Sequence, residues 1–357
     1  MNFLLVAGAR PNFMKIAPLR EALISRGAGV RLVHTGQHYD ALMSDIFFRD
    51  LDMPPPDFHL GVGPGDRVTQ TRKIIEGLLP IARDGASETI VVVGDVTSTA
   101  AAALAGMLAG IRVAHVEAGL RSFNWTMPEE LNRMIADHHV DMLFVTDPAG
   151  KENLRRERIP DERIHFVGNI MIDSLRRAEA RATTVALERY GLQPQTYGML
   201  TLHRPENVDE PSAFARAWEA VRRAARRLSL IFPVHHRTRE RMQAFGITGD
   251  ERIRLIDPVG YLEMIALVKY ARVALTDSGG LQEEATALGV PCLIMRNETE
   301  RPVTVDIGTS EIVGTDPMKV EEAMDRVMTG AWKKGGLPDL WDGHAADRIA
   351  EILLKSK

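Results

Sequence analysis

The sequence contains a single cysteine among its 357 residues, so no disulfide can form within the chain. Cys292 lies in the apolar run PCLIM, which favours a buried structural thiol and a reducing compartment. No secretory leader is predicted, and the longest weakly charged run, residues 96–111, is shorter than the roughly 20 apolar residues of a membrane span. These absences predict a cytoplasmic protein without a membrane partner.

An excess of charge of one sign is also missing. The formal net charge is −4, and the basic residues are spread among the acidic ones. This pattern does not indicate a nucleic-acid-binding face, so any phosphate-binding site must be local. The hydrophobic fraction of 45% is ordinary for a globular protein, and 357 residues suit two domains of roughly 150 to 180 residues each.

Short β-branched runs alternate with longer helical patterns along the chain, which is typical of βαβ units and parallel sheets. A first series of predicted strands is FLLVAG, VRLVHTG, DFHLGVG, TIVVVGD, RVAHVEA, DMLFVTD and RIHFVGN, and a second is GMLTLHR, SLIFPVH, RIRLIDP, VALTDSG, PCLIMRN and EIVG. Helices are expected at residues 14–25 and 97–108, and residues 173–195 are expected to form a helix near the domain boundary. We predict two Rossmann-like doubly wound α/β domains, residues 1–172 and 173–357, with the last helix packing back on the first.

Almost every predicted strand ends in a polar residue. In open parallel sheets ligands bind just outside the carboxyl ends of the strands, so two sheets facing each other would form one central cleft. The alternative is that loops are simply polar. The strand-end residues are Arg10, Gln37, Asp95, Glu117, Asp147, Asn169, His203, His235, Asp277 and Ser278.

The segment TDSGGLQEEA combines a strand end, a Ser-Gly-Gly turn and a helix start. Its free backbone N–H groups and helix dipole predict an anion site, in which Gly279 and Gly280 allow close approach and Ser278 adds a donor. Glu284, one turn on, can accept from ribose hydroxyls. The segment matches neither a Walker loop nor a dinucleotide fingerprint, and the alternative is a turn without a ligand.

A second candidate anion site follows the first strand. In GARPNFMK, Arg10 and Lys15 place two cations beside a helix N-terminus, where pyrophosphate is the expected ligand. A helix start of this kind without any ligand is equally common.

Acidic residues gather near two adjacent strand ends. GDVTS and HVEAGLRSFNWTMPEELNR supply Asp95, Glu117, Glu129 and Glu130, and convergent carboxylates suit proton removal and return. Alternatively, Glu129 and Glu130 only occupy the first turn of a helix that begins after Pro128.

Histidines end two strands of the second series: His203, next to Arg204, and the pair His235 and His236. Either position can face the cleft. No thiolate and no His-Glu-x-x-His pattern accompanies them, so no metal site is predicted.

Together, these motifs resemble the non-hydrolysing UDP-N-acetylglucosamine 2-epimerases. The similar stretches follow in order over nearly the whole chain, and TDSGGLQEEA followed by TERP is highly specific. The others are GARPNFMKIAPL, TGQHYDALMSD, VVVGDVTST, HVEAGLRS, PEELNR, VGN, TLHRPEN, LIDPVGYLEM and MRNETERP. The resemblance implies a glycosyltransferase-B type of fold, a homodimer, and no NAD or metal cofactor.

The resemblance also implies a mechanism, in which UDP is eliminated from C1 and C2 of UDP-GlcNAc to give bound 2-acetamidoglucal, and UDP then adds back with a proton on the other face. The implied proton-transfer groups are Asp95, Glu117 and one of Glu129 or Glu130. The implied UDP-binding positions are Arg10, Lys15, His203, Val259, Met264, Ser278, Gly279, Gly280, Glu284 and Arg301. Val259 stands where other members carry Gln near the uracil, and Val303 where many carry Glu.

Some members bind a second substrate molecule as an activator, and the matching positions are Gln37, Arg67, Arg204 and His235 or His236. Asp40 departs from this pattern, because many activated members carry Gln there. Three alternatives remain at this stage: an epimerase of a related UDP-diacetamido-uronic acid, a glycosyltransferase on the same scaffold, and a nucleotide-sugar-binding protein without chemistry.

Overall fold

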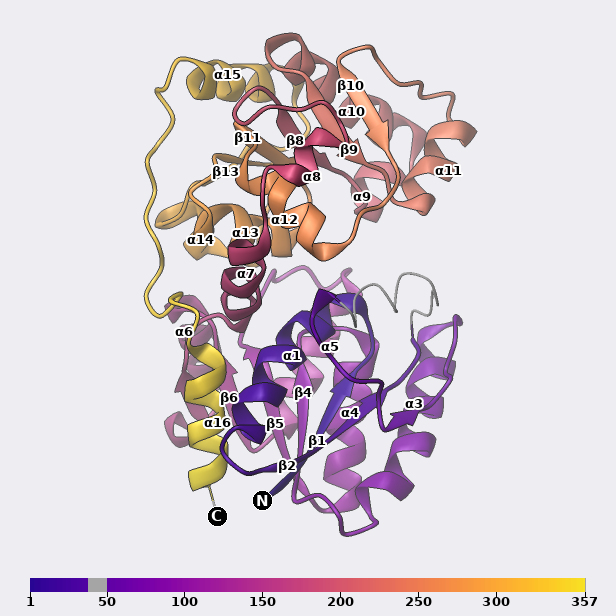
Figure 1. Ribbon diagram of the computed structural model, residues 1–357. Coiled ribbons are helices and arrows are strands. Elements are labelled where there is room, and N and C mark those ends of the chain that lie inside the picture. Colours follow the sequence, from indigo (N-terminus) through magenta and orange to yellow (C-terminus); the bar gives the residue numbers. More distant parts are fainter. Residues whose placement is uncertain (38–49, 357) are drawn as a thin grey trace. The chain divides into compact units, whose positions relative to one another are not determined.

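The computed structural model describes residues 1–37 and 50–356, and the chain divides into two units (Figure 1). Unit 1 comprises Met1–Ser174 together with Asp339–Lys357, and unit 2 comprises Leu175–Pro338. The C-terminal segment, residues 339–357, thus belongs with the first unit. Each unit is an α/β structure built on its own parallel sheet, as the sequence predicts.

Unit 1 contains a seven-stranded parallel sheet in the order β3-β2-β1-β4-β5-β6-β7. Its strands are β1 (Asn2–Ala7), β2 (Gly29–His34), β3 (Phe58–His59), β4 (Thr89–Val93), β5 (Arg112–Ala118), β6 (Met142–Val145) and β7 (Ile164–Phe166). Its helices include α1 (Arg10–Ile24), α3 (Arg67–Ala82), α4 (Thr97–Ala109), α5 (Pro128–His139), α6 (Pro148–Arg156), a 3₁₀ turn (Asp161–Arg163) and α16 (Ala345–Lys355). The chain order reverses between β1 and β4, which makes their carboxyl ends the switch point of this sheet.

The alternation of side chains along each strand gives unit 1 two apolar faces. On β1, Phe3 and Leu5 face a core shared with α1 and α16, whereas Leu4 and Val6 face one shared with α3, α4, α5 and α6. Helix α16 lies alongside α1 (Figure 1). Asp173 accepts hydrogen bonds from the first two backbone N–H groups of α16, at 3.2 and 2.8 Å. This cap and the shared core explain why the C-terminal segment belongs with unit 1.

Unit 2 contains a six-stranded parallel sheet in the order β10-β9-β8-β11-β12-β13, so its switch point lies between β8 and β11. The strands are β8 (Gly198–Thr201), β9 (Leu230–Pro233), β10 (Ile253–Ile256), β11 (Val273–Thr276), β12 (Cys292–Ile294) and β13 (Ser310–Ile312). The helices include α9 (Pro205–Val208), α10 (Pro211–Arg227), α11 (His236–Ala244), α12 (Tyr261–Lys269), α13 (Gly279–Ala287), α14 (Pro302–Asp306) and α15 (Pro317–Met328).

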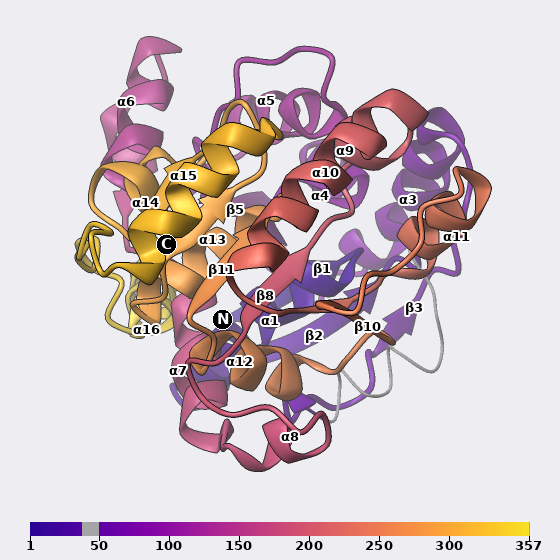
Figure 2. The same ribbon diagram turned by 90° about the horizontal axis from the view of Figure 1, so that it is seen from above.

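The apolar stripes of α10 and α15 cover one face of the unit 2 sheet, and the two helices lie side by side (Figure 2). Phe214 and Trp218 of α10 share a core with Phe232 of β9 and Val320 of α15. Cys292 is fully buried in β12, where it is a structural thiol.

The expected helix over residues 173–195 is interrupted. Helix α7 (Ile170–Arg181) begins earlier and ends before Thr183 and Thr184, and a short helix α8 (Val185–Glu188) follows. Two consecutive β-branched threonines are poor helix formers, which explains the break. In the part of the chain that the structure describes, no helix is long and apolar enough to cross a membrane.

Candidate functional site

Asn12 joins the two strands of the unit 1 switch point. Its Oδ1 accepts from the backbone N–H groups of Gly8 and Ala9, both at 3.0 Å, and its Nδ2 donates to the carbonyl of Val93 at 3.0 Å. Val93 is the last residue of β4. A single buried amide therefore fixes the turn between β1 and α1 against the end of β4.

Lys15, one turn into α1, forms an ion pair with Glu117, and both side chains are buried. The pair needs a glycine nearby: a Cβ on Gly94 would lie 3.0 Å from the Lys15 ammonium, and Gly94 has a φ of 68°. Lys15 was expected to bind phosphate. The contact observed in the structure is with an acid of the same unit.

Glu117 lies in an irregularity of β5. The register between β5 and β6 shifts between Val116 and Ala118, and Glu117 itself has a φ of 73°. A non-glycine residue in this region costs of order 1 kcal/mol or more, and such bulges re-aim a side chain at the edge of a sheet. The buried ion pair with Lys15 contributes to holding this conformation.

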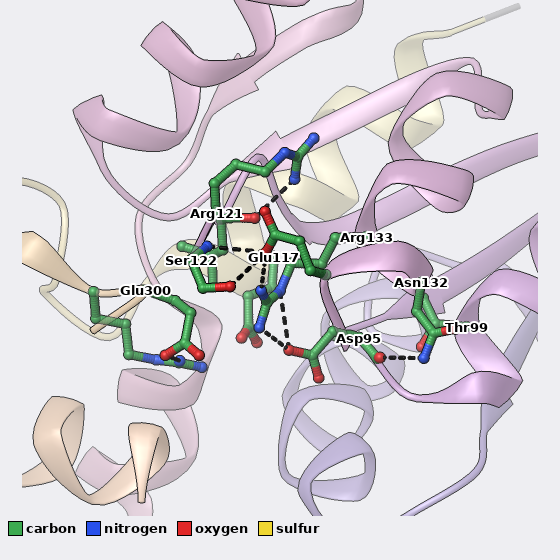
Figure 3. A network of polar contacts seen from close by, with 12 residues as sticks. Asp95, Thr99, Glu117, Arg121, Ser122, Asn132, Arg133 and Glu300 are labelled. Atoms are coloured by element: carbon green, nitrogen blue, oxygen red, sulfur yellow. Dashed lines mark hydrogen bonds and ion pairs between the residues drawn. The ribbon is translucent and has the colours of Figure 1, made fainter. Parts of the chain in front are cut away.

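Asp95 follows β4 and is held by α5 (Figure 3). Arg133 donates to its Oδ2 from Nε at 3.1 Å and from Nη2 at 2.7 Å, while Asn132 donates to its backbone carbonyl at 2.9 Å. The Asp95 side chain remains 25% exposed. It is therefore both fixed in position and reachable by a ligand.

The two neighbouring acids of α5 have different environments. Glu130 is buried and accepts from the backbone N–H and hydroxyl of Ser122, both at 2.9 Å, from the N–H of Phe123 at 3.0 Å, and from Arg133 at 2.7 Å. Glu129 is only half-buried. Glu130 thus cross-links the loop before α5 to the arginine that holds Asp95.

Asp277 is the corresponding centre of the unit 2 switch point. This fully buried carboxylate accepts from the backbone N–H groups of His203 and Arg204 and from Nδ2 of Asn207, at 2.9 to 3.1 Å. His203 Nδ1 lies 3.2 Å from Asp277 Oδ1. Burial alone would raise the pKa of Asp277, but His203 and the backbone donors outweigh it and lower that pKa.

This contact orients the His203 imidazole. With Nδ1 turned to Asp277, the other ring nitrogen is left for a ligand, and the side chain is 44% exposed. The β8 end therefore presents one imidazole nitrogen.

Helix α13 begins at Gly279, directly after Ser278. A Cβ on Gly279 would lie 2.4 Å from Nη1 of Arg301, whereas a Cβ on Gly280 would meet no atom within 4 Å. The first glycine lets the buried guanidinium lie against the helix N-terminus, and the second leaves open space. Backbone N–H groups, a helix dipole and an arginine here suit a phosphate group.

Glu284 lies in the buried part of α13, next to Glu283 and the Tyr261 hydroxyl. Burial and the Glu283 charge raise the pKa of Glu284 to about 8, against a lowering by the hydrogen bond with Tyr261. Glu283 also accepts from Arg301 Nε at 2.7 Å. Glu284 therefore holds its proton to a higher pH than an exposed glutamate does.

A cavity of about 300 Å³ lies at the carboxyl end of β10 within unit 2. Val259 and Pro258 form part of its wall, together with Tyr190 and Arg239. Met264 lies on α12 and is half-buried.

The family model for UDP-N-acetylglucosamine 2-epimerase matches residues 22–354. The chain belongs to this family. The UDP-N-acetylglucosamine 2-epimerase of Methanocaldococcus jannaschii is 36% identical over 367 residues, covering 100% of both chains. The crystal structure of the Methanocaldococcus jannaschii UDP-GlcNAc 2-epimerase, in complex with UDP-GlcNAc and UDP, superposes with a TM-score of 0.91 at 36% identity and covers 99% of each chain.

A second similar protein is named for a different substrate. The UDP-2,3-diacetamido-2,3-dideoxy-D-glucuronate 2-epimerase of Pseudomonas aeruginosa is 37% identical over 361 residues, covering 99% of this chain and 100% of the relative. Overall identity therefore does not separate the two sugars.

The remaining positions that the resemblance implies are spread over both units. Arg10 is the first residue of α1. Gln37 is buried, and its Oε1 accepts from the backbone N–H and hydroxyl of Ser98 at 3.0 and 2.7 Å. Arg67 opens α3 in unit 1, whereas Arg204, His235 and His236 belong to unit 2. Asp40 lies outside the described residues.

Two of the strand-end residues serve as helix caps rather than ligand groups. Asp147 accepts from the backbone N–H of Gly150 at 3.1 Å at the start of α6, and Asn169 accepts from that of Met171 at 2.9 Å at the start of α7. Among the residues that the structure describes, no group of three or more His, Cys, Asp or Glu side chains is arranged to hold a metal ion.

The residues that hold the acids in position were not predicted from the sequence. Asn12 and Arg133 lie within the quoted motifs, and an Asn directly after an Arg-Pro pair is a usable signal for a turn. Asp277 was noted only as a strand end. His115 and Asp137 carry no local signal, because their contact joins a strand to a helix 22 residues away.

Proposed function

We propose that the protein is a non-hydrolysing UDP-N-acetylglucosamine 2-epimerase, which interconverts UDP-GlcNAc and UDP-ManNAc. The family match over residues 22–354 carries this proposal. The contents of the two switch points support it, because unit 1 presents fixed carboxylates and unit 2 presents a helix N-terminus with an arginine and an imidazole. An epimerase acting through elimination needs both kinds of group.

The proposed reaction breaks two bonds of the substrate and restores them. A base removes the proton from C2, the electron pair of the C2–H bond forms the C1=C2 double bond of 2-acetamidoglucal, and the C1–O electron pair leaves with UDP. UDP then attacks C1 again while an acid delivers a proton to the other face of C2. The sum is inversion at C2 with no net consumption of water, so the reaction is an isomerisation.

We assign proton transfer to Asp95, Glu117 and Glu129. Asp95 supports this assignment because it is fixed by Arg133 and still partly exposed. Glu130 accepts four hydrogen bonds and is buried, so we assign it to positioning Arg133 and leave Glu129 as the α5 acid for the sugar. Lys15 neutralises Glu117 in the ligand-free protein and remains a candidate for the phosphates.

UDP is assigned to unit 2 and to Arg10 of unit 1. The departing diphosphate carries the developing negative charge, and Ser278, Gly279, Gly280 and Arg301 form a site that stabilises such charge. His203, oriented by Asp277, presents its second ring nitrogen to the same ligand. Glu284 is assigned to the ribose hydroxyls, and Val259 and Met264 to the surroundings of the base.

The Pseudomonas aeruginosa relative favours a second candidate substrate, UDP-2,3-diacetamido-2,3-dideoxy-D-glucuronate, for the same chemistry. The two sugars differ in the group at C3 and in a carboxylate at C6. Comparing kcat/KM for both nucleotide sugars decides between them.

Proton NMR of UDP-GlcNAc with the protein in deuterated water tests the function itself. The expected result is UDP-ManNAc in equilibrium with UDP-GlcNAc, with one solvent deuteron at C2 of both. Stoichiometric free sugar and UDP would instead indicate a hydrolysing enzyme. An unchanged substrate without an acceptor would favour a glycosyltransferase, and unchanged C2–H signals together with UDP binding would favour a binding protein.

A further inference from the structure

His115 lies fully buried in β5, two residues before Glu117 and directly behind the end of β4. Its Nδ1 lies 2.7 Å from Oδ1 of Asp137, and its Nε2 lies 2.7 Å from the backbone carbonyl oxygen of Gly94. A peptide carbonyl can only accept a hydrogen bond. Nε2 must therefore carry a proton.

Asp137 is an acceptor as well. It also receives the N–H of Gly119 at 3.1 Å and pairs with Nη1 of Arg121 at 2.7 Å. Burial would raise its pKa, but the hydrogen bonds and charges of His115 and Arg121 outweigh burial and lower the pKa below its usual range. An ionised Asp137 has no proton to donate, so Nδ1 of His115 must carry one too.

The surrounding charges balance such a cation. Arg121 makes a two-pronged contact with Glu157, at 2.7 Å from both Nε and Nη2. One imidazolium, one guanidinium and two carboxylates then form a neutral group that is buried except at Glu157, and His138 lies 3.0 Å from Glu157 at this partly exposed edge. A Cβ on Gly94 would meet the side chains of Lys15 and Asn12, so both of these side chains lie close to Gly94.

The contact of His115 with Gly94 determines where the following residue lies. Gly94 has a φ of 68°, and its N–H donates to the carbonyl of Val116 at 3.0 Å. With its own carbonyl held by His115, both backbone polar groups of Gly94 are fixed. Asp95 comes next in the chain, so a shift of Gly94 would move its carboxylate.

We infer that His115 is a positioning residue that stays doubly protonated and uses the Gly94 carbonyl to hold Asp95 in place for proton transfer. The inference rests on the proposed function for its kinetic consequence only. The charge state of His115 follows from the contacts of unit 1 and can be measured without any substrate.

Two isosteric variants separate the two hydrogen bonds. In His115→Asn the amide nitrogen takes the place of Nδ1, so the donor to Asp137 is kept and the donor to Gly94 is lost. In His115→Gln the amide nitrogen approaches the place of Nε2, so the donor to Gly94 is kept. We expect kcat to fall at least tenfold in His115→Asn, with the Kd for UDP within twofold of wild type, and His115→Gln to recover most of the loss.

The matched control is His165→Asn, because His165 lies two strands away in β7 and takes no part in the proposed site. Its kcat should equal that of wild type even where its stability is lower. If both His115 variants lose kcat equally, or only in proportion to a loss of folded protein, His115 has a merely structural role.

Nitrogen-15 NMR of histidine-labelled wild-type protein tests the charge state, with the His115 signals assigned by their absence in His115→Gln. Two protonated ring nitrogens are expected at pH 7. The signals of a neutral tautomer at pH 7 would overturn the inference. This measurement decides the matter even if His115→Asn does not fold, and a wild-type protein inactive on UDP-GlcNAc would count against the proposed function instead.

Discussion

The switch points of the two units lie at the same place in sheets of the same central strand order, yet they hold different chemistry. In unit 1 the strand ends carry acids that are cross-linked by Arg133, Lys15 and the His115–Asp137 pair. In unit 2 they carry a glycine turn at a helix N-terminus and one buried acid that serves as an acceptor for its surroundings. The same fold therefore presents fixed carboxylates in one unit and a helix N-terminus with an arginine in the other, because the loops differ and the sheets do not.

The comparison also separates two uses of a buried carboxylate. Asp95 is fixed from one side and still partly exposed, which suits a group that exchanges protons. Asp277 is fully buried and accepts hydrogen bonds from several donors, which suits a group that holds others in place. Exposure and the number of donors, rather than residue type, distinguish the two.

The largest expected effect is that of Asp95→Asn. Loss of a general acid or base typically costs roughly 10²- to 10⁴-fold in rate, so kcat should fall by about 10²-fold or more. Calorimetric titration should find UDP affinity unchanged. If Asp95→Asn loses UDP affinity instead, our assignment of the sugar chemistry to unit 1 and of UDP binding to unit 2 is contradicted.

Asp277→Asn comes next. The amide would place an NH₂ group among the donors of His203, Arg204 and Asn207, and leaving buried donors without an acceptor costs about 1–3 kcal/mol. We expect that loss in chemical denaturation and a roughly tenfold weaker UDP affinity, because His203 loses its orientation. Unchanged C2 proton exchange at saturating substrate would agree with this assignment, whereas a selective loss of exchange would contradict it.

Glu284→Gln should weaken UDP binding by roughly 1–3 kcal/mol, the cost of losing a charge-assisted hydrogen bond to ribose. The effect should grow with pH. The pKa of Glu284 is raised to about 8, so in wild type the ionised acceptor becomes available only as the pH approaches that value. UDP titrations from pH 6 to pH 8.5 with both proteins check this, since the titration of UDP itself is common to both.

The same raised pKa affects stability in a known direction. The folded state favours the neutral form of Glu284. The stability that this preference contributes is fully present below the pKa of Glu284 in the unfolded chain, near 4.5, and is lost as the pH rises through about 8. Wild type should therefore lose stability relative to Glu284→Gln across this range, by a few kcal/mol at most. A difference in unfolding free energy between the two proteins that stays constant with pH would refute this prediction.

The smallest effects should come from the two glycines of α13. Gly279→Ala places a methyl against Arg301 and should cost about 1–3 kcal/mol of stability, because the guanidinium must leave Glu283. Gly280→Ala meets no atom and should be neutral or stabilising by a few tenths of a kcal/mol, as usual for Gly to Ala in a helix. Both substitutions should weaken UDP binding. Equal stability of the two variants would contradict the close approach of Arg301 to Gly279.

Much of the architecture could be predicted from the sequence. The short apolar runs predicted the strands of both sheets, because a β-branched run that is buried on both faces and the turn residues that bound it are local properties of the sequence. The Ser-Gly-Gly turn could be placed at a helix start for the same reason. The break between α7 and α8 was missed, because helical propensity over residues 173–195 is high on average and two threonines decide the interruption.

The role of each acid could not be predicted from its own sequence motif, because the contacts that distinguish the acids form only in the folded structure. Glu129 and Glu130 are neighbours with the same side chain, but the turn of α5 brings Arg133 to Glu130 and the loop before α5 brings Ser122 to the same carboxylate. Lys15 resembles a phosphate ligand until β5 is seen to present Glu117 to it. The sequence by itself determined the alternation of strands and helices and the identity of the groups at the strand ends. The tertiary structure decided which of those groups are saturated by partners and which stay reachable, because burial and hydrogen bonding are set by residues that are remote in the chain.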